Sequence, residues 1–129
     1  MKTPDLAQVE EAGVRAWTGA TDPLKTAAAH AGLKFSACDI AHAKDRAALF
    51  AEIDCKLHLP EHFGHNWDAL ADVLEDRDWL GKTGRVIVLS GVAPYRKDHP
   101  TDWATFEDIL SEAAEFWKEL HVAFWVFKA

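Results

Sequence analysis

The sequence lacks several features that would place it in a specialised class of protein. It has only 2 cysteines, Cys38 and Cys55, too few for a disulfide framework or a metal knuckle, and we expect both to be small core residues. No low-complexity tract is present and 49% of the residues are hydrophobic, which excludes disorder. No apolar run approaches the ~20 residues of a membrane span, and residues 1–13 lack the apolar segment of a signal peptide. The sequence therefore predicts a cytoplasmic protein without a membrane-bound part.

Positive charge is also scarce. The net charge is −7, and residues 61–78 contain six acidic residues and one base, Arg77, a local net charge of −5. This balance argues against direct binding of nucleic acid, because phosphate contacts require Lys and Arg. A cationic partner suits the chain better. The six acids are Glu61, Asp68, Asp72, Glu75, Asp76 and Asp78.

Short apolar or alternating segments predict strands, and amphipathic segments between them predict helices. Strands are expected at residues 13–17, 33–40, 85–90 and 121–127. Helices are expected at residues 23–31 and 43–57, after Asn66, and from Thr101 or Asp102 to about Glu119, with a loop at residues 91–99. Strands separated by helices imply parallel pairing with right-handed crossovers. The sequence thus predicts one α/β domain with a small parallel sheet of three to four strands flanked by helices.

Two of the predicted helices have clear apolar faces at helical spacing. On the helix at residues 43–57 the face consists of Leu49, Phe50, Ile53 and Leu57. On the last helix it consists of Phe106, Ile109, Leu110, Ala113, Phe116 and Trp117.

The helix after Asn66 carries an acidic stripe. Asp68, Asp72 and Asp76 recur every four residues, with Glu75 between the last two, and together they cover about 100° of helix surface. Like charges at this spacing destabilise a helix by roughly 0.2–0.5 kcal/mol per pair. The stripe does not stabilise the fold, so it is either a solvated face or a surface that a partner binds. Trp67, Leu70 and Leu74 fall on the opposite side and should face the core.

The stretch LPEHFGHNWDALADVL, residues 59–74, resembles the signature of the barstar family: a Leu-Pro-Glu-aromatic-aromatic-Gly loop followed by Asn-x-Asp-Ala-Leu-x-Asp. The resemblance implies a small parallel sheet flanked by helices and an intracellular inhibitor of a secreted bacterial ribonuclease. It implies a single barstar-like domain over residues 1–129, with its core at residues 33–127. Residues 1–32 form an N-terminal extension expected to add an edge strand and a helix.

The resemblance also implies roles for individual residues. Asp72 takes the place of the central carboxylate, which occupies the site of a substrate phosphate in the ribonuclease, and Asp68 is the second acid. Gly64 and Asn66 shape the loop and offer backbone contacts. Trp67 shields the rim or packs inward.

Other site positions depart from the family pattern or lie outside the central stretch. His62 replaces a Tyr that stacks on a catalytic His, so stacking persists without the hydroxyl. Ala71 stands where the family has a Trp, and Glu75 adds a charge where a small polar residue is expected. Glu115, on the last helix, aligns with a peripheral acid that pairs with an Arg.

These observations predict an inhibitor of a cognate secreted ribonuclease that has a basic active site. The inhibitor is expected to act without catalysis, cofactor or metal, and to be a monomer when free. One alternative is an immunity protein for a toxin that is not a barnase-like ribonuclease, or for another basic partner. Another is a small metal-dependent hydrolase that uses a histidine cluster. That cluster would consist of His58, His62, His65 and Asp68.

Overall fold

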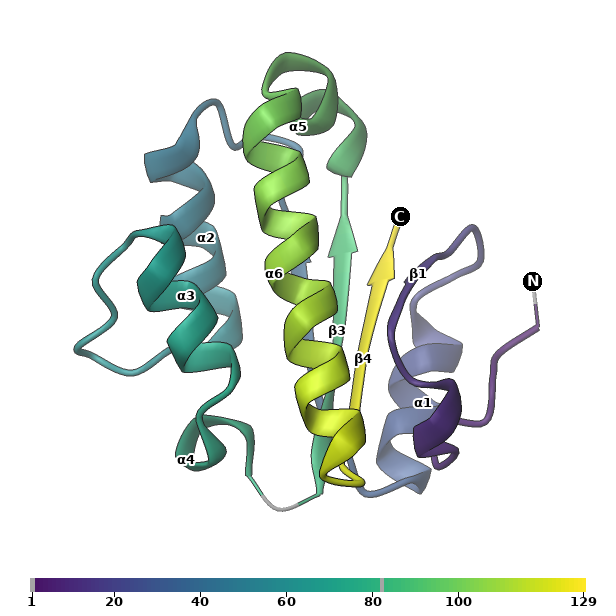
Figure 1. Ribbon diagram of the computed structural model, residues 1–129. Coiled ribbons are helices and arrows are strands. Elements are labelled where there is room, and N and C mark those ends of the chain that lie inside the picture. Colours follow the sequence, from purple (N-terminus) through teal and green to yellow (C-terminus); the bar gives the residue numbers. More distant parts are fainter. Residues whose placement is uncertain (1, 82) are drawn as a thin grey trace.

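The fold is built on a parallel sheet whose strands are joined through helices (Figure 1). The computed structural model describes residues 2–81 and 83–129. The sheet has four strands in the order β1-β4-β3-β2, and every neighbouring pair is parallel, which confirms the predicted fold class. The strands are β1 (Val14–Ala16), β2 (Lys34–Asp39), β3 (Gly84–Ser90) and β4 (Ala123–Lys128).

Helices precede or follow each of these strands. The chain begins with a short 3-10 turn, η1 (Val9–Glu11), and continues through α1 and α2 to a pair of short helices, α3 and α4. The two last helices, α5 and α6, lie between β3 and β4. Among the described residues, no helix combines the length and the hydropathy of a bilayer span. The helices are α1 (Asp22–His30), α2 (Arg46–Leu57), α3 (Trp67–Leu74), α4 (Arg77–Leu80), α5 (Val92–Asp98) and α6 (Pro100–Glu119).

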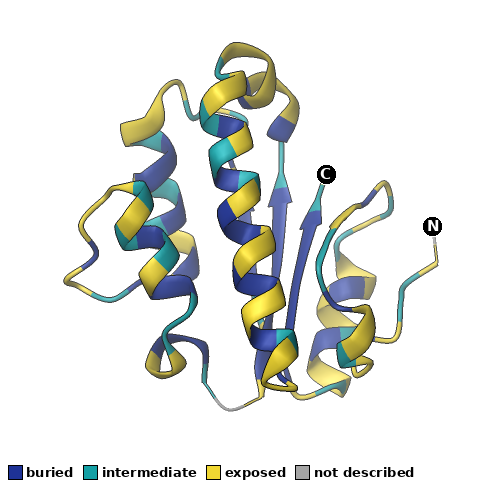
Figure 2. Cartoon of the chain, viewed as in Figure 1, coloured by how far each residue is buried: buried dark blue, intermediate teal, exposed yellow. Residues whose placement is uncertain are grey.

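The two central strands are buried on both faces, as the dense β-branched run of β3 predicts (Figure 2). Their side chains alternate between two hydrophobic cores. Ile87 and Val126 are partners in the β3–β4 register and face the larger core, which α2, α3 and α6 cover. Val88 and Phe127 are also partners and face a smaller core, which α1 and the N-terminal segment cover.

Residues 1–32 add the predicted edge strand and helix. β1 pairs with β4, and α1 packs Leu24 and Ala28 into the smaller core. The indole Nε1 of Trp125 on β4 donates to the carbonyl oxygen of Leu6 at 3.0 Å. The extension is therefore tied to the centre of the sheet by both packing and a buried hydrogen bond.

Residues 91–99 form a helix, so the predicted loop is wrong. Gly91, with φ of 65°, ends β3 in the left-handed region, and α5 begins at the next residue. Pro94 lies in the first turn, where its missing N–H costs no hydrogen bond. The buried ring of Tyr95 fixes the helix to the core, and its hydroxyl donates to Asp102 Oδ2 at 3.1 Å.

Neither Thr101 nor Asp102 caps α6, which begins at Pro100 after His99 and has no side-chain cap. The Asp102 carboxylate instead accepts from Arg46 on α2 at 2.8 Å as well as from Tyr95. This long-range pair holds the first turn of α6 against α2. Arg46 itself begins α2, three residues later than predicted, because the side chain of Asp45 caps the helix.

Two side chains predicted to lie in the core are exposed. Cys55 lies on the outer side of α2, whereas its neighbours on the apolar face, Ile53 and Leu57, are buried. Phe116 is 38% exposed because the adjacent Trp117 takes the buried position on α6. Cys38 is buried as predicted.

The start of β3 depends on Gly84, and this gives a first prediction. Its φ is 108°, and a Cβ placed there would lie 2.2 Å from the carbonyl oxygen of Ala123 on β4. We expect Gly84→Ala to lower the free energy of unfolding, measured by urea denaturation, by more than about 2 kcal/mol. Gly32→Ala is the control. The φ of Gly32 is 74°, but no atom lies within 4 Å of a Cβ built there, so only the strain of a left-handed backbone, about 1–2 kcal/mol, applies. Equal losses in the two variants would contradict the steric explanation.

Candidate functional site

The candidate site begins with the N-terminus of α3, where Asn66 makes two hydrogen bonds. Its Oδ1 accepts from the backbone N–H of Ala69 at 2.8 Å, which confirms the predicted cap. Its Nδ2 donates to the carbonyl oxygen of Gly64 at 3.2 Å, so the same side chain holds the preceding loop. Asp68 follows in the first turn, where the helix dipole favours a carboxylate.

The acidic residues do not all lie on one helix, which corrects the predicted stripe. α3 ends at Leu74, with Glu75 as its C-terminal cap residue. Asp76 has extended backbone geometry and begins α4, because its Oδ1 accepts from the N–H of Asp78 at 2.8 Å. Asp68 and Asp72 thus form the exposed acidic face of α3, and Asp76 is half-buried beyond its end.

The loop before α3 is pinned to α2 through His65. This residue lies in the left-handed region with φ of 51°. Its Nε2 is 2.9 Å from Asp54 Oδ2, and its ring lies 5.0 Å from that of the buried Phe63, which packs edge-on against Phe50. The sequence singled out His65 only as a candidate metal ligand. Its pairing with Asp54 spans eleven residues and follows no local pattern.

A groove of about 310 Å³ lies between the loop and α3. It brings His62 and Gly64 together with Asp72, three of the residues predicted for the partner surface. A Cβ on Gly64 would lie 3.2 Å from Asn66 Nδ2, so the loop approaches the helix cap closely at this residue. The full lining consists of His62, Phe63, Gly64, Ala69, Asp72, Val73 and Asp76.

Two tryptophans fix α3 to the rest of the protein. Trp117 on α6 donates its indole N–H to the carbonyl oxygen of Leu74 at 2.7 Å, at the last turn of α3. Trp67 is half-buried and stacks on Phe106, with ring centroids 6.1 Å apart. Trp67 therefore packs inward, and Ala71 beside it also packs against the larger core. The exposed carboxylates of α3 are held on a fixed support.

The electrostatics of the site involve an acid that the sequence does not single out. The pKa of the Glu75 carboxyl is raised, first by burial and then by the negative charges of Glu112 on α6 and of Asp72. Glu112, rather than Glu115, is the α6 acid close to this group. Glu115 lines a separate cavity with Arg15 of β1 and lies 3.5 Å from Lys118.

The histidines near the loop do not gather into a metal site. Within residues 2–81 and 83–129, no group of three or more His, Cys, Asp or Glu side chains is arranged to hold a metal ion. His62 lies in the groove, whereas His65 pairs with Asp54 on the α2 side of the loop. The cluster needed for a metal-dependent hydrolase is therefore not formed by the described residues.

The fold and the site define a class: a small parallel α/β protein that holds an acidic helix and an adjoining loop at its surface. The chain belongs to the barstar family, because the family model described as Barstar (barnase inhibitor) matches residues 33–129. The match begins just before β2, so residues 1–32 lie outside it. By its description the family consists of inhibitors, and the predicted resemblance is confirmed. No curated protein matches the chain.

The raised pKa of Glu75 gives a second prediction. A carboxyl whose folded-state pKa lies above its ordinary value of 4.5 stabilises the fold below that pH and loses this contribution as the pH rises through the folded-state pKa. We expect Glu75→Gln to raise the free energy of unfolding at pH 7 by less than about 1 kcal/mol, because solvent screens a partly exposed carboxylate. The gain should vanish near pH 3.

The matched control is Glu61→Gln, at an exposed loop position. Urea denaturation of both variants and the parent at pH 3 and pH 7 provides the comparison. A gain for Glu75→Gln that is the same at both pH values, or that Glu61→Gln shares, would contradict the ionisation of Glu75 in its partly buried, acidic surroundings as the cause.

Proposed function

We propose that this protein inhibits a bacterial ribonuclease by inserting its acidic helix and loop into the basic active site of the enzyme. Asp72 carries the proposal, because it is the exposed carboxylate that lies both on α3 and in the groove beside the loop. It would take the position of a substrate phosphate among the cationic side chains of the enzyme. No catalytic step by the inhibitor is required.

The availability of these carboxylates supports the proposal. Within the described part of the chain, no Lys, Arg or His forms an ion pair with Asp68 or Asp72. Both are therefore free to pair with cations of a partner. Because α3 is held at both ends, little conformational entropy is lost when the surface binds, which favours affinity.

The proposed partner surface consists of residues with distinct roles. Asp68, Asp72 and Glu75 supply negative charge, and Glu112 adds to it from α6. His62, Gly64 and Asn66 form the loop side of the surface. Trp67 and Ala71 pack the inner side of α3 against the larger core, whereas Glu115 contributes at the periphery.

The charge distribution should also act before contact. Residues 61–78 have a net charge of −5 within a chain of net charge −7, so a basic enzyme is attracted towards this region. Such attraction accelerates association and weakens as salt screens it over about 10 Å. This behaviour suits an inhibitor that must capture a ribonuclease quickly.

We propose that the inhibitor acts in the cytoplasm on a secreted ribonuclease, as a monomer when free. The two cysteines are both free, as expected in a reducing compartment. We also infer one barstar-like domain over residues 1–129, in which residues 1–32 extend the core formed by the rest of the chain.

A second candidate is an immunity protein for another basic toxin. Two departures favour it: Ala71 lacks the large aromatic side chain of the family at that position, and His62 lacks the phenol hydroxyl. Capture of a basic partner that has no ribonuclease activity would support this candidate over ribonuclease inhibition.

The third prediction concerns Asp72. A cognate ribonuclease is first found by titrating the protein against a panel of small secreted bacterial ribonucleases. We expect Asp72→Ala to weaken binding to that enzyme by more than about 2 kcal/mol, or roughly 30-fold in Kd. The fold should be retained, because the side chain is exposed. Asp98→Ala, which removes an exposed carboxylate of α5, is the control and should inhibit like the parent. Equal inhibition by Asp72→Ala and the parent would refute the assignment.

A further inference from the structure

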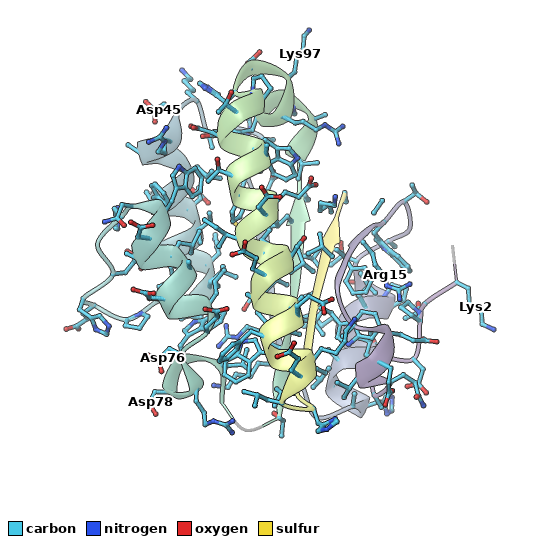
Figure 3. All side chains as sticks on the ribbon, in the orientation of Figure 1. Lys2, Arg15, Asp45, Asp76, Asp78 and Lys97 are labelled. Carbon is cyan, nitrogen blue, oxygen red and sulfur yellow. The ribbon has the colours of Figure 1, made fainter. Side chains whose placement is uncertain are left out.

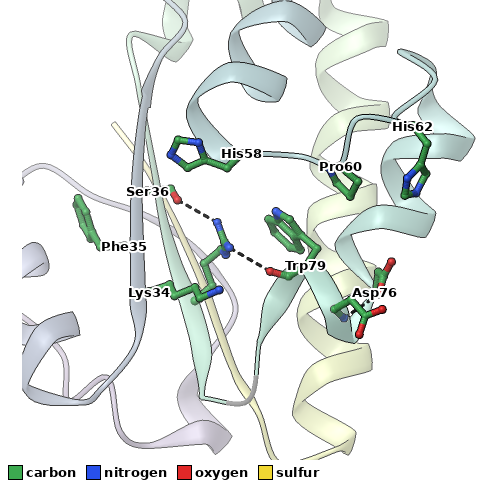
Figure 4. A pocket seen from close by; sticks show the side chains of 10 residues that line it. Lys34, Phe35, Ser36, His58, Pro60, His62, Asp76 and Trp79 are labelled. Carbon is green, nitrogen blue, oxygen red and sulfur yellow. Dashed lines mark hydrogen bonds between the residues drawn. The ribbon is translucent and has the colours of Figure 1, made fainter.

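Another cavity, of about 630 Å³, lies on the other side of the loop from α3 (Figure 4). It is bounded by β2, the end of α2 and the start of α4, and it shares His62 and Asp76 with the groove. Basic and hydrogen-bonding side chains are its main polar lining. These are Lys34, Ser36, His58, His62, Trp79 and Arg85.

Arg85 is the unusual member of this lining. The residue is only 5% exposed, and its guanidinium lies 4.2 Å from the centre of the Trp79 ring. It donates to Ser36 Oγ and to the carbonyl oxygens of Leu57 and Trp79, each at 3.2 Å. A guanidinium has five N–H donors, so the described residues leave two of them unused. One of the two is on Nε, for which residues 2–81 and 83–129 provide no hydrogen-bond partner.

The charge of Arg85 also has no counter-ion among the described residues. No carboxylate forms an ion pair with it, and its pKa is lowered by burial with no opposing contribution from an acid. A buried charge is costly unless a charge of opposite sign compensates it. The three neutral acceptors leave this guanidinium without such compensation.

Lys34 adds a second cation at the same cavity. Lys34 is the first residue of β2. A Cβ built on Gly81 would lie 3.3 Å from Lys34 Nζ, so the ammonium of Lys34 lies beside Gly81. No described carboxylate forms an ion pair with it. His58, in left-handed geometry at the end of α2, is exposed on the same cavity.

Two acids also line the cavity, at the side formed by α4. Asp76 lies across the cavity from Ser36 and His58 (Figure 4). Its Oδ1 accepts the backbone N–H of Asp78, so this carboxylate is engaged in capping α4. Asp78 is exposed, and neither acid forms an ion pair with Arg85 or Lys34 among the described residues.

We propose that this cavity binds an oxyanion, a phosphate or a carboxylate group, between the guanidinium of Arg85 and the ammonium of Lys34. An oxyanion accepts several hydrogen bonds at once and matches a guanidinium fork in geometry and charge. The site is distinct from the acidic surface of α3 and opposite to it in sign. It does not depend on the proposed inhibition of a ribonuclease.

The test is a titration of the full chain, followed by ¹H–¹⁵N NMR, with inorganic phosphate in one arm and acetate in the other at constant ionic strength. We expect saturable shifts confined to the backbone near Lys34 and His58 and to the indole N–H of Trp79. Lys34→Met should weaken binding about tenfold, as expected for the loss of one charge-assisted contact. Lys34 is exposed, so the fold should tolerate this change.

Lys25→Met, at an exposed lysine of α1, is the matched control and should bind like the parent. Tighter binding of phosphate or of acetate would identify which oxyanion the site prefers. The proposal is overturned if neither anion gives saturable shifts up to about 50 mM, or if Lys34→Met binds as the parent does. Arg85 would then serve only to hold the last carbonyl of α2.

Discussion

The site depends on holding a short, like-charged helix in place. α3 has 8 residues, fewer than an isolated helix needs to be stable in water. Asp68 and Asp72 oppose its formation, because they lie one turn apart without a described cation beside them. Its position must therefore come from neighbours. Asn66 satisfies the first turn and ties the loop to it, and the indole of Trp117 satisfies the carbonyl of Leu74 at the other end. Beyond that end, Asp76 and Asp78 lie at the start of α4 (Figure 3).

The same rigidity makes the charge useful. Glu75 caps the end of α3 and Glu112 lies on α6; burial first, and then repulsion from Glu112 and Asp72, raises the pKa of Glu75. A flexible support would let these side chains and Asp72 separate and reduce the repulsion. On a fixed support the repulsion persists in the free protein, and the basic partner proposed above would relieve it on binding. The electrostatic cost in the free state would then become a gain in the complex.

The sequence predicts the sheet well because its signals are local. β3 is a dense β-branched run, and burial on both faces is the only stable environment for such a strand. The end of α3 is not predicted, because Asp72 and Asp76 are spaced as in one continuous helix. The chain instead leaves the helix after Leu74, and Asp76 begins α4 by accepting the N–H of Asp78. α5 is missed because Pro and Gly at its start favour a loop. The hydrogen bond between His65 and Asp54 and the charge repulsion between Glu75 and Glu112 join different parts of the chain and leave no periodic signal.

The N-terminal extension follows from the composition of β4. Trp125 and Phe127 place large apolar rings on the sheet face opposite α3, and rings of this size must be covered. Residues 1–32 supply that cover through α1, Trp17 and the backbone of Leu6. The extension is therefore part of the core, although it lies outside the family match. Because α1 and Trp17 cover the sheet face opposite α3, they stabilise β3 and β4, the strands on which the larger core and α3 are built.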